Sequence, residues 1–343
     1  MSVERRLGMR IRGTLGVVSV AGLMLALAGC GGSDNSSSSG SGATRGTVKV
    51  GVAFDKMDDS FRVGEKKYLD KYAKEMGVKL TYQDAQQDAQ RQSSQVQSFI
   101  AQRVDGIIEI PWDTQAVAAD IAAAQAANIP LVVMDQQPAD TSRVFYYVGG
   151  NPATDGRAAG DFLVKAAAGK PVKVLELEGS LNNQNGIERA KGFQDAIAKS
   201  PNIQIVAKAP TDWKADKALA ATQNALQQHS DLSAVYAPWT GALPAVYSAL
   251  KAKNKFSKVG EPNHVMTMSI NGDEIGCKYV GDKSNDLDIA TPVADMSRNA
   301  IKAIVDAKNG TQPAKRVDLL PGVPYGPANF ATQKSKVWGC AGQ

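Results

Sequence analysis

Short apolar runs alternate with longer amphipathic stretches along the chain after residue 47, and this alternation restricts the fold more than any other feature. Covered parallel strands read as continuous apolar runs, and a helical crossover usually joins parallel neighbours. The sequence therefore predicts an α/β fold with doubly wound parallel sheets, arranged as two similar lobes. Strands are expected at 48–54, 79–82, 106–110, 129–134, 144–148, 172–177, 203–207, 234–237, 265–271 and 288–290. Helices are expected at 61–76, 94–103, 114–127, 155–168, 187–199, 215–228, 244–253 and 294–309.

The first thirty residues have the order of a secretory signal. Four arginines between positions 5 and 12 precede an apolar run at 15–28, which is short for a membrane span. The run ends in Leu27-Ala28-Gly29-Cys30, which resembles the lipobox of bacterial lipoproteins. This resemblance implies that Cys30 is lipidated and becomes the first mature residue. The alternative is an ordinary signal followed by a cysteine that occurs there by chance.

A tract that is mostly Ser, Gly, Asn and Thr follows at residues 31–46 and has no large apolar side chain. Such tracts are flexible coils, and one of this length reaches roughly 20 Å. We therefore expect a signal peptide at 1–29 and a linker at 30–46. The mature protein would be exported and held by lipid on the outer face of the cytoplasmic membrane, at the cell surface or in the periplasm.

The charge balance gives no reason to expect a nucleic-acid partner. The formal net charge is +5, and residues 1–29 hold four Arg and one Glu, so the remainder carries only +2. No dense basic stripe occurs. The two histidines, His229 and His264, stand singly in expected loops, and we predict no metal and no cofactor. Cys277 and Cys340 form an even pair in an oxidising compartment, so a disulfide is expected, with two unpaired thiols as the alternative.

Polar and aromatic side chains follow the expected strands at their carboxyl ends, where ligands bind in parallel sheets. Carboxylates, amides and Arg bind hydroxyls in fixed directions, and Trp and Phe offer flat faces to a sugar ring or a cation. The alternatives are that the Asp and Asn residues cap helices and that Trp213 and Trp239 lie in the core. The predicted ligand-binding residues at these ends are Asp55, Asp59, Phe61, Arg62, Trp112, Asp135, Gln136, Arg189, Trp213, Trp239 and Asn271.

At these positions the chain resembles the ribose-binding-like family of periplasmic solute-binding proteins, which serve ABC importers. The resemblance covers about 48–320 and lies in six stretches: 50–61, 124–135, 159–161, 188–193, 211–213 and 269–272. It implies a type I periplasmic binding protein with a cleft between two lobes. It also implies hydroxyl acceptors at Asp59, Asp135 and Asn271, stacking faces at Phe61 and Trp213, and a fork of donors at Arg189.

The family's chain crosses between its lobes three times. By this resemblance we place the crossings near Gly150, Thr291 and Leu320, which gives an N-terminal lobe of 47–150 plus 291–320 and a C-terminal lobe of 151–290 plus 321–343. Cys277 and Cys340 then share one lobe, which is consistent with a disulfide. Thr291 stands where the family usually has a hinge Gln that binds ligand, so it joins the predicted site.

Several positions depart from the family pattern. Arg62 replaces an aromatic residue, Gln136 replaces an Arg, and Trp239-Thr240 replaces an Asn-Asp pair. These departures give a site rich in carboxylate and tryptophan, which could suit an amino sugar, a polyol or a cationic solute. We do not expect ribose in particular.

The sequence thus predicts a lipid-anchored monomer that captures a small sugar or polyol by hinge closure and delivers it to an ABC permease. The alternatives are a sensory receptor for a small solute and a binding protein for a nucleoside or a cation. Asp55 and Asp59 could form a carboxylate pair for glycoside hydrolysis, but they lie on one loop and cannot flank a scissile bond. The chain also contains no Gly-x-Ser-x-Gly elbow and no zinc motif, so we expect no enzyme.

Overall fold

The structure is a computed structural model that describes residues 46–341. The predicted signal peptide, the lipidation site Cys30 and the linker lie outside the described residues. From Gly46 onward the chain forms one compact unit. Among the described residues, no helix combines the length and apolar character that crossing a membrane requires.

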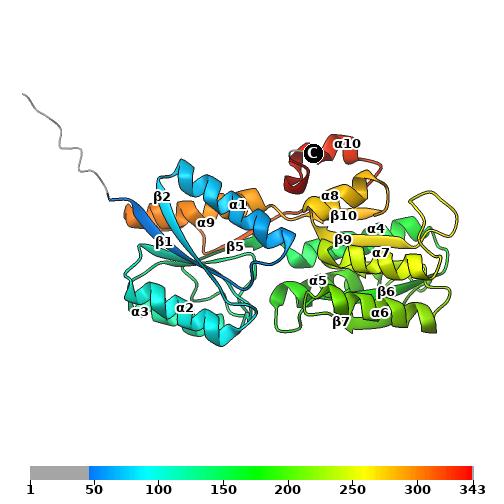
Figure 1. The fold of residues 1–343 in the computed structure, drawn as a ribbon, viewed down its shortest axis with the longest axis horizontal. Coiled ribbons are helices and arrows are strands. Elements are labelled where there is room, and N and C mark those ends of the chain that lie inside the picture. The colour runs from blue at the N-terminus through cyan, green and yellow to red at the C-terminus, as the bar shows by residue number, and fades with distance from the viewer. Residues whose placement is uncertain (1–45, 342–343) are drawn as a thin grey trace, which may run out of the picture. The chain divides into compact units, whose positions relative to one another are not determined.

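The first sheet is parallel throughout and has the strand order β11-β5-β4-β3-β1-β2. Helices cover both of its faces (Figure 1). One face packs on α1 and α9, and the other packs on α2 and α3. The strands are β1 (Val48–Phe54), β2 (Val78–Asp84), β3 (Gly106–Ile110), β4 (Leu131–Met134), β5 (Tyr146–Gly150) and β11 (Val317–Leu320). The helices are α1 (Ser60–Glu75), α2 (Ala89–Ala101), α3 (Val117–Ala126) and α9 (Val293–Lys308).

The second sheet has the order β12-β10-β9-β8-β6-β7, and only β12 runs antiparallel to its neighbour. One face packs on α4 and α5, and the other on α6 and α7. The strands are β6 (Val172–Glu178), β7 (Ile203–Pro210), β8 (Ala234–Ala237), β9 (Met266–Asn271), β10 (Leu287–Ala290) and β12 (Val323–Tyr325). The helices are α4 (Pro152–Ala167), α5 (Gln184–Ile197), α6 (Ala215–Gln228), α7 (Leu243–Ala252), α8 (Glu274–Gly281) and α10 (Phe330–Gln333).

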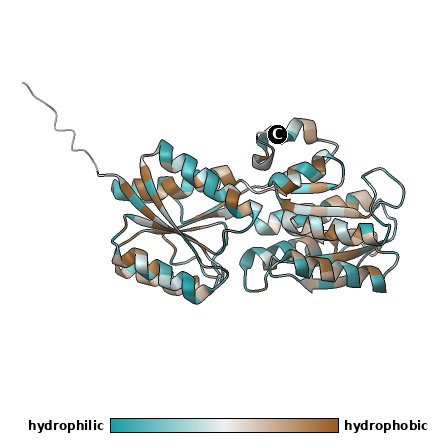
Figure 2. Cartoon of the chain, in the orientation of Figure 1, coloured by the Kyte–Doolittle hydropathy of each residue, from teal (hydrophilic) through white to brown (hydrophobic). Residues whose placement is uncertain are grey.

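The two sheets share one strand order, because β6 to β10 repeat the arrangement of β1 to β5. The fold is therefore α/β with two doubly wound lobes, as the sequence predicts. Hydropathic colouring shows the apolar residues on the strands and on the helix faces toward them (Figure 2). In each sheet the order reverses beside the first strand, at β1 and β6, and ligands bind beyond the carboxyl ends of strands at such points.

The chain passes between the sheets at three places. It leaves β5 at Gly150 for α4, leaves β10 at Ala290 for α9, and leaves β11 at Leu320 for β12. Helix α9 packs its apolar face against the first sheet through Met296, Ala300 and Ile301.

Most of the predicted strands and helices are present, with ends that shift by a few residues. The helix expected at 94–103 begins five residues earlier, at Ala89, because the Asp88 side chain accepts a hydrogen bond from the Arg91 amide and caps the helix there. The sequence interpretation missed α8, β11, β12 and α10. These elements are short and lie beside Gly and Pro residues, where hydrophobic periodicity carries little signal.

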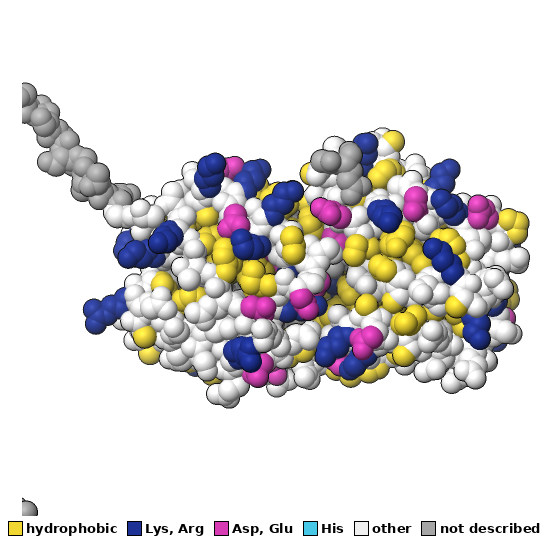
Figure 3. All heavy atoms as spheres, in the orientation of Figure 1, with side chains coloured by type: hydrophobic (Ala, Val, Ile, Leu, Met, Phe, Trp, Pro, Cys, Tyr) yellow, Lys and Arg dark blue, Asp and Glu magenta, His cyan; other side chains and the backbone are white. Residues whose placement is uncertain are grey.

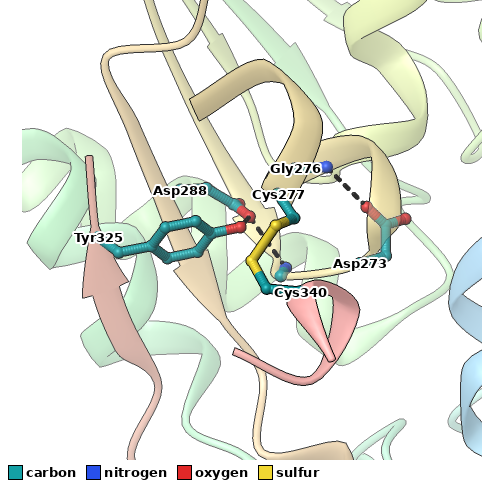
Figure 4. Close-up of a disulfide and its surroundings, with 7 residues drawn as sticks. Asp273, Gly276, Cys277, Asp288, Tyr325 and Cys340 are labelled. Carbon is teal, nitrogen blue, oxygen red and sulfur yellow. Dashed lines mark hydrogen bonds between the residues drawn. A yellow bond between two sulfur atoms is a disulfide. The ribbon is translucent and has the colours of Figure 1, made fainter. Parts of the chain in front are cut away.

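Figure 4 shows how the C-terminal segment attaches to the second sheet. Cys277 of α8 and Cys340 are joined by a disulfide, the pairing that the sequence suggested. Nearby, the Tyr325 hydroxyl donates a hydrogen bond of 2.6 Å to the Asp288 carboxylate. The half-cystines lie in a small buried cluster with Val280 and Val337, so the end of the chain has an apolar core of its own.

Candidate functional site

A small cavity lies where the carboxyl ends of strands from both sheets meet. Its volume is about 40 Å³, enough for only a few water molecules. A larger hollow of about 420 Å³ shares six of its lining residues, so the site continues outward. The residues that line the small cavity are Asp55, Lys56, Asp59, Phe61, Arg62, Asp135, Gln136, Asn185, Arg189, Trp213, Trp239 and Asn271.

Arg62 holds three carboxylates together at the floor of the site. Its Nε and Nη2 atoms each lie 2.8 Å from an Asp55 oxygen, and its Nη1 atom lies 2.7 Å from Asp135 and 2.6 Å from Glu65. All four side chains are buried. Burial would lower the pKa of Arg62, but the three acidic neighbours raise it well above its usual value. Arg62 therefore keeps its charge, and its donors are engaged by the protein itself.

Burial changes the charge of the acidic partners. It raises the pKa of Glu65 well above its usual value, although the Arg62 charge opposes this shift, and the Asp135 charge raises the pKa further. Burial also raises the pKa of Asp55 against the opposing effect of Arg62. Three acidic side chains thus share the single positive charge of Arg62, and burial favours the protonated form of Glu65.

Asp59 and Lys56 form a second ion pair at the edge of the cavity, with Nζ and Oδ2 2.7 Å apart. Burial would raise the pKa of Asp59, but Lys56 and Arg62 outweigh it and lower the pKa. The other oxygen of Asp59 accepts a hydrogen bond of 2.8 Å from the Arg62 amide and caps α1. Asp59 therefore both caps a helix and lines the cavity.

Two tryptophans form an apolar wall on the side of the second sheet. The rings of Trp213 and Trp239 are perpendicular, with centroids 5.5 Å apart. A Cβ atom on Gly179 would overlap with the Trp213 ring, so a glycine there lets the backbone approach it closely. On the other side of the cavity, Phe61 contributes a ring from α1. Flat rings on both sides suit a ring-shaped ligand with apolar faces.

Three of the lining residues have strained backbone conformations. Asp135, Trp213 and Asn271 have φ angles of 62°, 57° and 141°. Asp135 and Asn271 lie at or just beyond the ends of β4 and β9. Such angles cost on the order of 1–3 kcal/mol each and cluster where a side chain must be aimed at a ligand.

Several polar atoms of the lining residues have no partner within the described part of the chain, although they are buried. They are Arg189 Nε, Trp213 Nε1 and Gln136 Oε1. The Arg189 guanidinium is fixed by a 2.8 Å bond from Nη1 to the Pro238 carbonyl and lies 6.0 Å from the Trp213 ring centroid. Two donors and one acceptor without a partner among the described residues thus belong to side chains that line a cavity with aromatic walls. A hydroxyl group both donates and accepts, so a polyhydroxylated ligand matches this set.

Comparison with known proteins identifies the family. The pattern of the periplasmic binding protein domain matches residues 50–312. The chain belongs to the periplasmic binding protein domain family. It is 27% identical over 289 residues to the ribose import binding protein of Bacillus subtilis, which covers 83% of this chain and 87% of that protein. It is 31% identical over 220 residues to the xylitol-binding protein of Mycolicibacterium smegmatis, which covers 63% of this chain and 60% of that protein.

Solved structures agree with this assignment. The crystal structure of a galactofuranose binding protein superposes with a TM-score of 0.78 and 26% identity, covering 85% of this chain and 99% of that one. Its title, like the names of the two relatives, describes a binding protein. Membership of the periplasmic binding protein domain family thus makes the chain a binding protein rather than an enzyme, as its sequence predicts.

Within this family fold, the structure brings ten of the twelve predicted ligand-binding residues to one cavity. Trp112 does not line it, and its amide donates to the Gln92 side chain at 2.8 Å. Thr291 does not line it either: it is buried at the second crossing, next to Gly150. Both residues follow strands as expected. However, Trp112 contacts α2, and Thr291 lies at a crossing between the two sheets.

Sequence reasoning omitted three residues that the structure places in or under the site. Lys56 pairs with Asp59, and Glu65 binds Arg62 from one helical turn away. Asn185 donates from Nδ2 to the Asp135 carbonyl at 3.1 Å, across the two sheets. The i, i+3 spacing of Arg62 and Glu65 on a predicted helix was a usable signal. For Asn185 the signal was its place just after a strand.

Proposed function

We propose that this chain is the substrate-binding component of an ABC importer and that it captures a small neutral sugar or polyol by closing two lobes around it. The unpaired donors and acceptor between aromatic walls are the observation that carries this proposal. The names of its relatives support the ligand class and the import role. Hinge closure suits a cavity that is too small, at about 40 Å³, to admit a sugar unless the lobes move apart.

The paired charges favour a neutral ligand over a cation. Asp55 and Asp135 share Arg62, and Asp59 pairs with Lys56, so each cavity carboxylate lies against a cation of the protein. A cationic ligand would have to displace one of these resident partners, at the cost of leaving a buried charge unpaired. Amino sugars and quaternary amines, which the sequence left open, are therefore not part of the proposal.

We propose lobes of 47–150 plus 291–320 and of 151–290 plus 321–343, which follow the sheet membership of the strands. The lipid anchor at Cys30 is also proposed, on the sequence order of residues 1–30. A lipid anchor of this kind would keep the binding protein beside its permease.

On the face drawn in Figure 3, acidic and basic side chains are interspersed. We propose that the protein is a monomer.

A thermal-shift screen tests the function. A chain that begins at Gly46 contains both sheets and would be heated with pentoses, hexoses, xylitol, myo-inositol, glucosamine, glucuronate, choline and adenosine. A ligand that binds only the native state adds about 2.7 kcal/mol of stability at one hundred times its dissociation constant. We expect a shift with a neutral sugar or polyol. Shifts with only choline, glucosamine or adenosine would overturn the ligand class, and no shift would contradict the receptor function.

A further inference from the structure

The chain beyond residue 312 lies outside the family's matched region and contains a segment that touches both lobes. We call residues 330–341 the C-terminal strap. It contains α10 and two short 3₁₀ turns, Lys334–Lys336 and Trp338–Cys340. The binding function as described above leaves this segment without a role.

The strap is fixed to the second lobe at several points. The disulfide joins Cys340 to Cys277 of α8, and Val337 is buried beside that helix. The Gly339 amide donates to the Gly272 carbonyl at 2.9 Å. A Cβ atom on Gly339 would overlap with the Asp273 backbone, so the two chain segments are in direct contact. The strap therefore moves with the second lobe.

From this base, Trp338 reaches the first lobe. Its ring lies edge-on to Phe61, with centroids 5.8 Å apart, and to Tyr68, with centroids 6.5 Å apart. A Cβ atom on Gly64, between these residues on α1, would overlap with the indole ring. The contact thus needs a glycine at that position of the helix. Aromatic pairs of this geometry attract each other beyond the effect of their buried area.

The same side chain also supports the site. Trp338 Nε1 donates a hydrogen bond of 2.9 Å to the carbonyl of Asn271, a cavity residue whose backbone is strained. Its other neighbour, Phe61, lines the cavity from the opposite lobe. One indole therefore touches a site residue from each lobe. Next to it, Ser60 Oγ donates to Asp273 Oδ2 at 2.5 Å, a hydrogen bond between the lobes.

We propose that the C-terminal strap is a clasp for lobe closure, in which Trp338 is a positioning residue that docks on Gly64 of α1 and fixes Asn271. This inference rests on the opening and closing of the proposed function. The strap stabilises the closed arrangement before ligand binds, because its contacts are made by protein alone. A binding protein that is partly closed in advance spends less of its ligand-binding free energy on closure.

Small-angle X-ray scattering of the ligand-free chain from Gly46 tests the clasp. The variants are Trp338→Ala, Gly64→Ala and the double variant. We expect the radius of gyration to rise in both single variants, because each removes or blocks the ring contact. Alanine is favoured over glycine in a helix interior, so Gly64→Ala should open the lobes without unfolding α1.

Two comparisons separate a clasp from ordinary packing. In the double variant the ring is absent, so Gly64→Ala should add nothing to the effect of Trp338→Ala. Phe330→Ala is the matched control, because Phe330 also lies on the strap but contacts Tyr325 and Gly281 within the second lobe. We expect it to leave the radius of gyration unchanged.

An unchanged radius of gyration in both Trp338→Ala and Gly64→Ala would overturn the clasp, whatever happens to their melting temperatures. An equal rise in Phe330→Ala would also overturn it, because the effect would then come from general loosening of the strap. No ligand enters these measurements. The clasp can therefore fail while the thermal-shift screen still supports the receptor, and the reverse also holds.

Discussion

Arg62 is the residue on which the charge balance of the site depends, because its guanidinium contacts Asp55, Glu65 and Asp135. We expect Arg62→Met to destabilise the protein by about 3–5 kcal/mol at pH 7, the typical cost of leaving buried charges without a partner. The difference in unfolding free energy between Arg62→Met and the wild type should be smaller at pH 5, because protonation of the freed carboxylates removes the unpaired charge. Urea unfolding of both proteins at the two pH values measures the effect.

Lys66→Met is the matched control for this prediction. Lys66 forms an i, i+4 ion pair of 2.6 Å with Asp70 on the same helix, but these side chains are 38% and 49% exposed, far more than Arg62 and its partners. Exposed pairs of this kind contribute about 0.3–0.5 kcal/mol, so the control should unfold almost like the wild type. Equal losses in the two variants would show that Arg62 has no special role in balancing buried carboxylates.

Trp213 offers a way to separate stacking from hydrogen bonding in the proposed site. Trp213→Phe keeps an aromatic face and removes the unpartnered Nε1 donor. We expect affinity for the best ligand of the thermal-shift screen to fall about tenfold, which corresponds to one hydrogen bond of roughly 1.4 kcal/mol. Isothermal titration calorimetry measures this. Unchanged affinity would mean that the indole N–H does not face the ligand, and an unchanged melting temperature without ligand serves as the folding control.

At the residue scale, the sequence predicted which side chains gather at the cavity but not how they pair. Asp55, Asp135 and Arg62 were expected to offer their polar atoms to a ligand, whereas Arg62 binds both carboxylates itself. Position after a strand indicates the edge at which a side chain lies. It does not indicate whether a neighbouring side chain takes up its hydrogen bonds, because that depends on contacts between distant segments.

Helix α4 carries a buried carboxyl group into the hinge. Asp155 lies in its first turn and is 3% exposed, and its Oδ2 atom has no partner among the described residues. It lies next to Gly150 of the first crossing and to Gly322 of the third. Burial raises the pKa of Asp155 to about 7, against the opposing charge of Arg189, and the Asp288 charge also raises it.

This hinge carboxyl makes the stability of the protein depend on pH. The unfolded carboxyl ionises near pH 3.8, while the native one keeps its proton until about pH 7. Its contribution is therefore complete below pH 3.8 and is lost as the pH rises to about 7, at up to about 1.4 kcal/mol per pH unit. We expect Asp155→Asn to remove this loss and to be more stable than the wild type at pH 8.

Urea unfolding from pH 4 to pH 8 compares Asp155→Asn with the wild type, so that other buried carboxyls cancel in the difference. Asp161→Asn, at an exposed position of the same helix, is the control and should follow the wild type. A difference between Asp155→Asn and the wild type that is constant with pH would contradict the prediction.

At the element scale, hydrophobic alternation predicted the long and buried elements and failed for the short ones. β3, α6 and β8 have the predicted ends, because continuous apolar runs or a clear helical period fill them. β11 and β12 join opposite sheets although only two residues separate them. Four-residue and three-residue strands of this kind bury few side chains, so their place is decided by the sheet edges that the rest of the chain leaves open.

The whole molecule consists of two lobes that have separate cores but share one site. The apolar clusters of the first sheet contain only residues of the first sheet, its helices and its loops, and the clusters of the second sheet are equally separate. The cavity takes Asp55, Phe61 and Asp135 from one lobe and Arg189, Trp213 and Asn271 from the other. A ligand in this cavity therefore needs both lobes to be folded at once.

This arrangement predicts how the protein unfolds on heating. Without ligand, the described residues couple the lobes through the three crossings, the strap and a few polar bonds, so we expect the calorimetric enthalpy to exceed the van't Hoff enthalpy. A saturating amount of the best ligand from the thermal-shift screen should bring the ratio toward one, because unfolding either lobe releases the ligand and forfeits its binding free energy. In Trp338→Ala without ligand, the calorimetric enthalpy should exceed the van't Hoff enthalpy by more than in the wild type. Most of this difference should disappear when ligand is added. A ratio of one in the ligand-free wild type would contradict the prediction, since it would mean that the contacts between the lobes already make them a single cooperative unit.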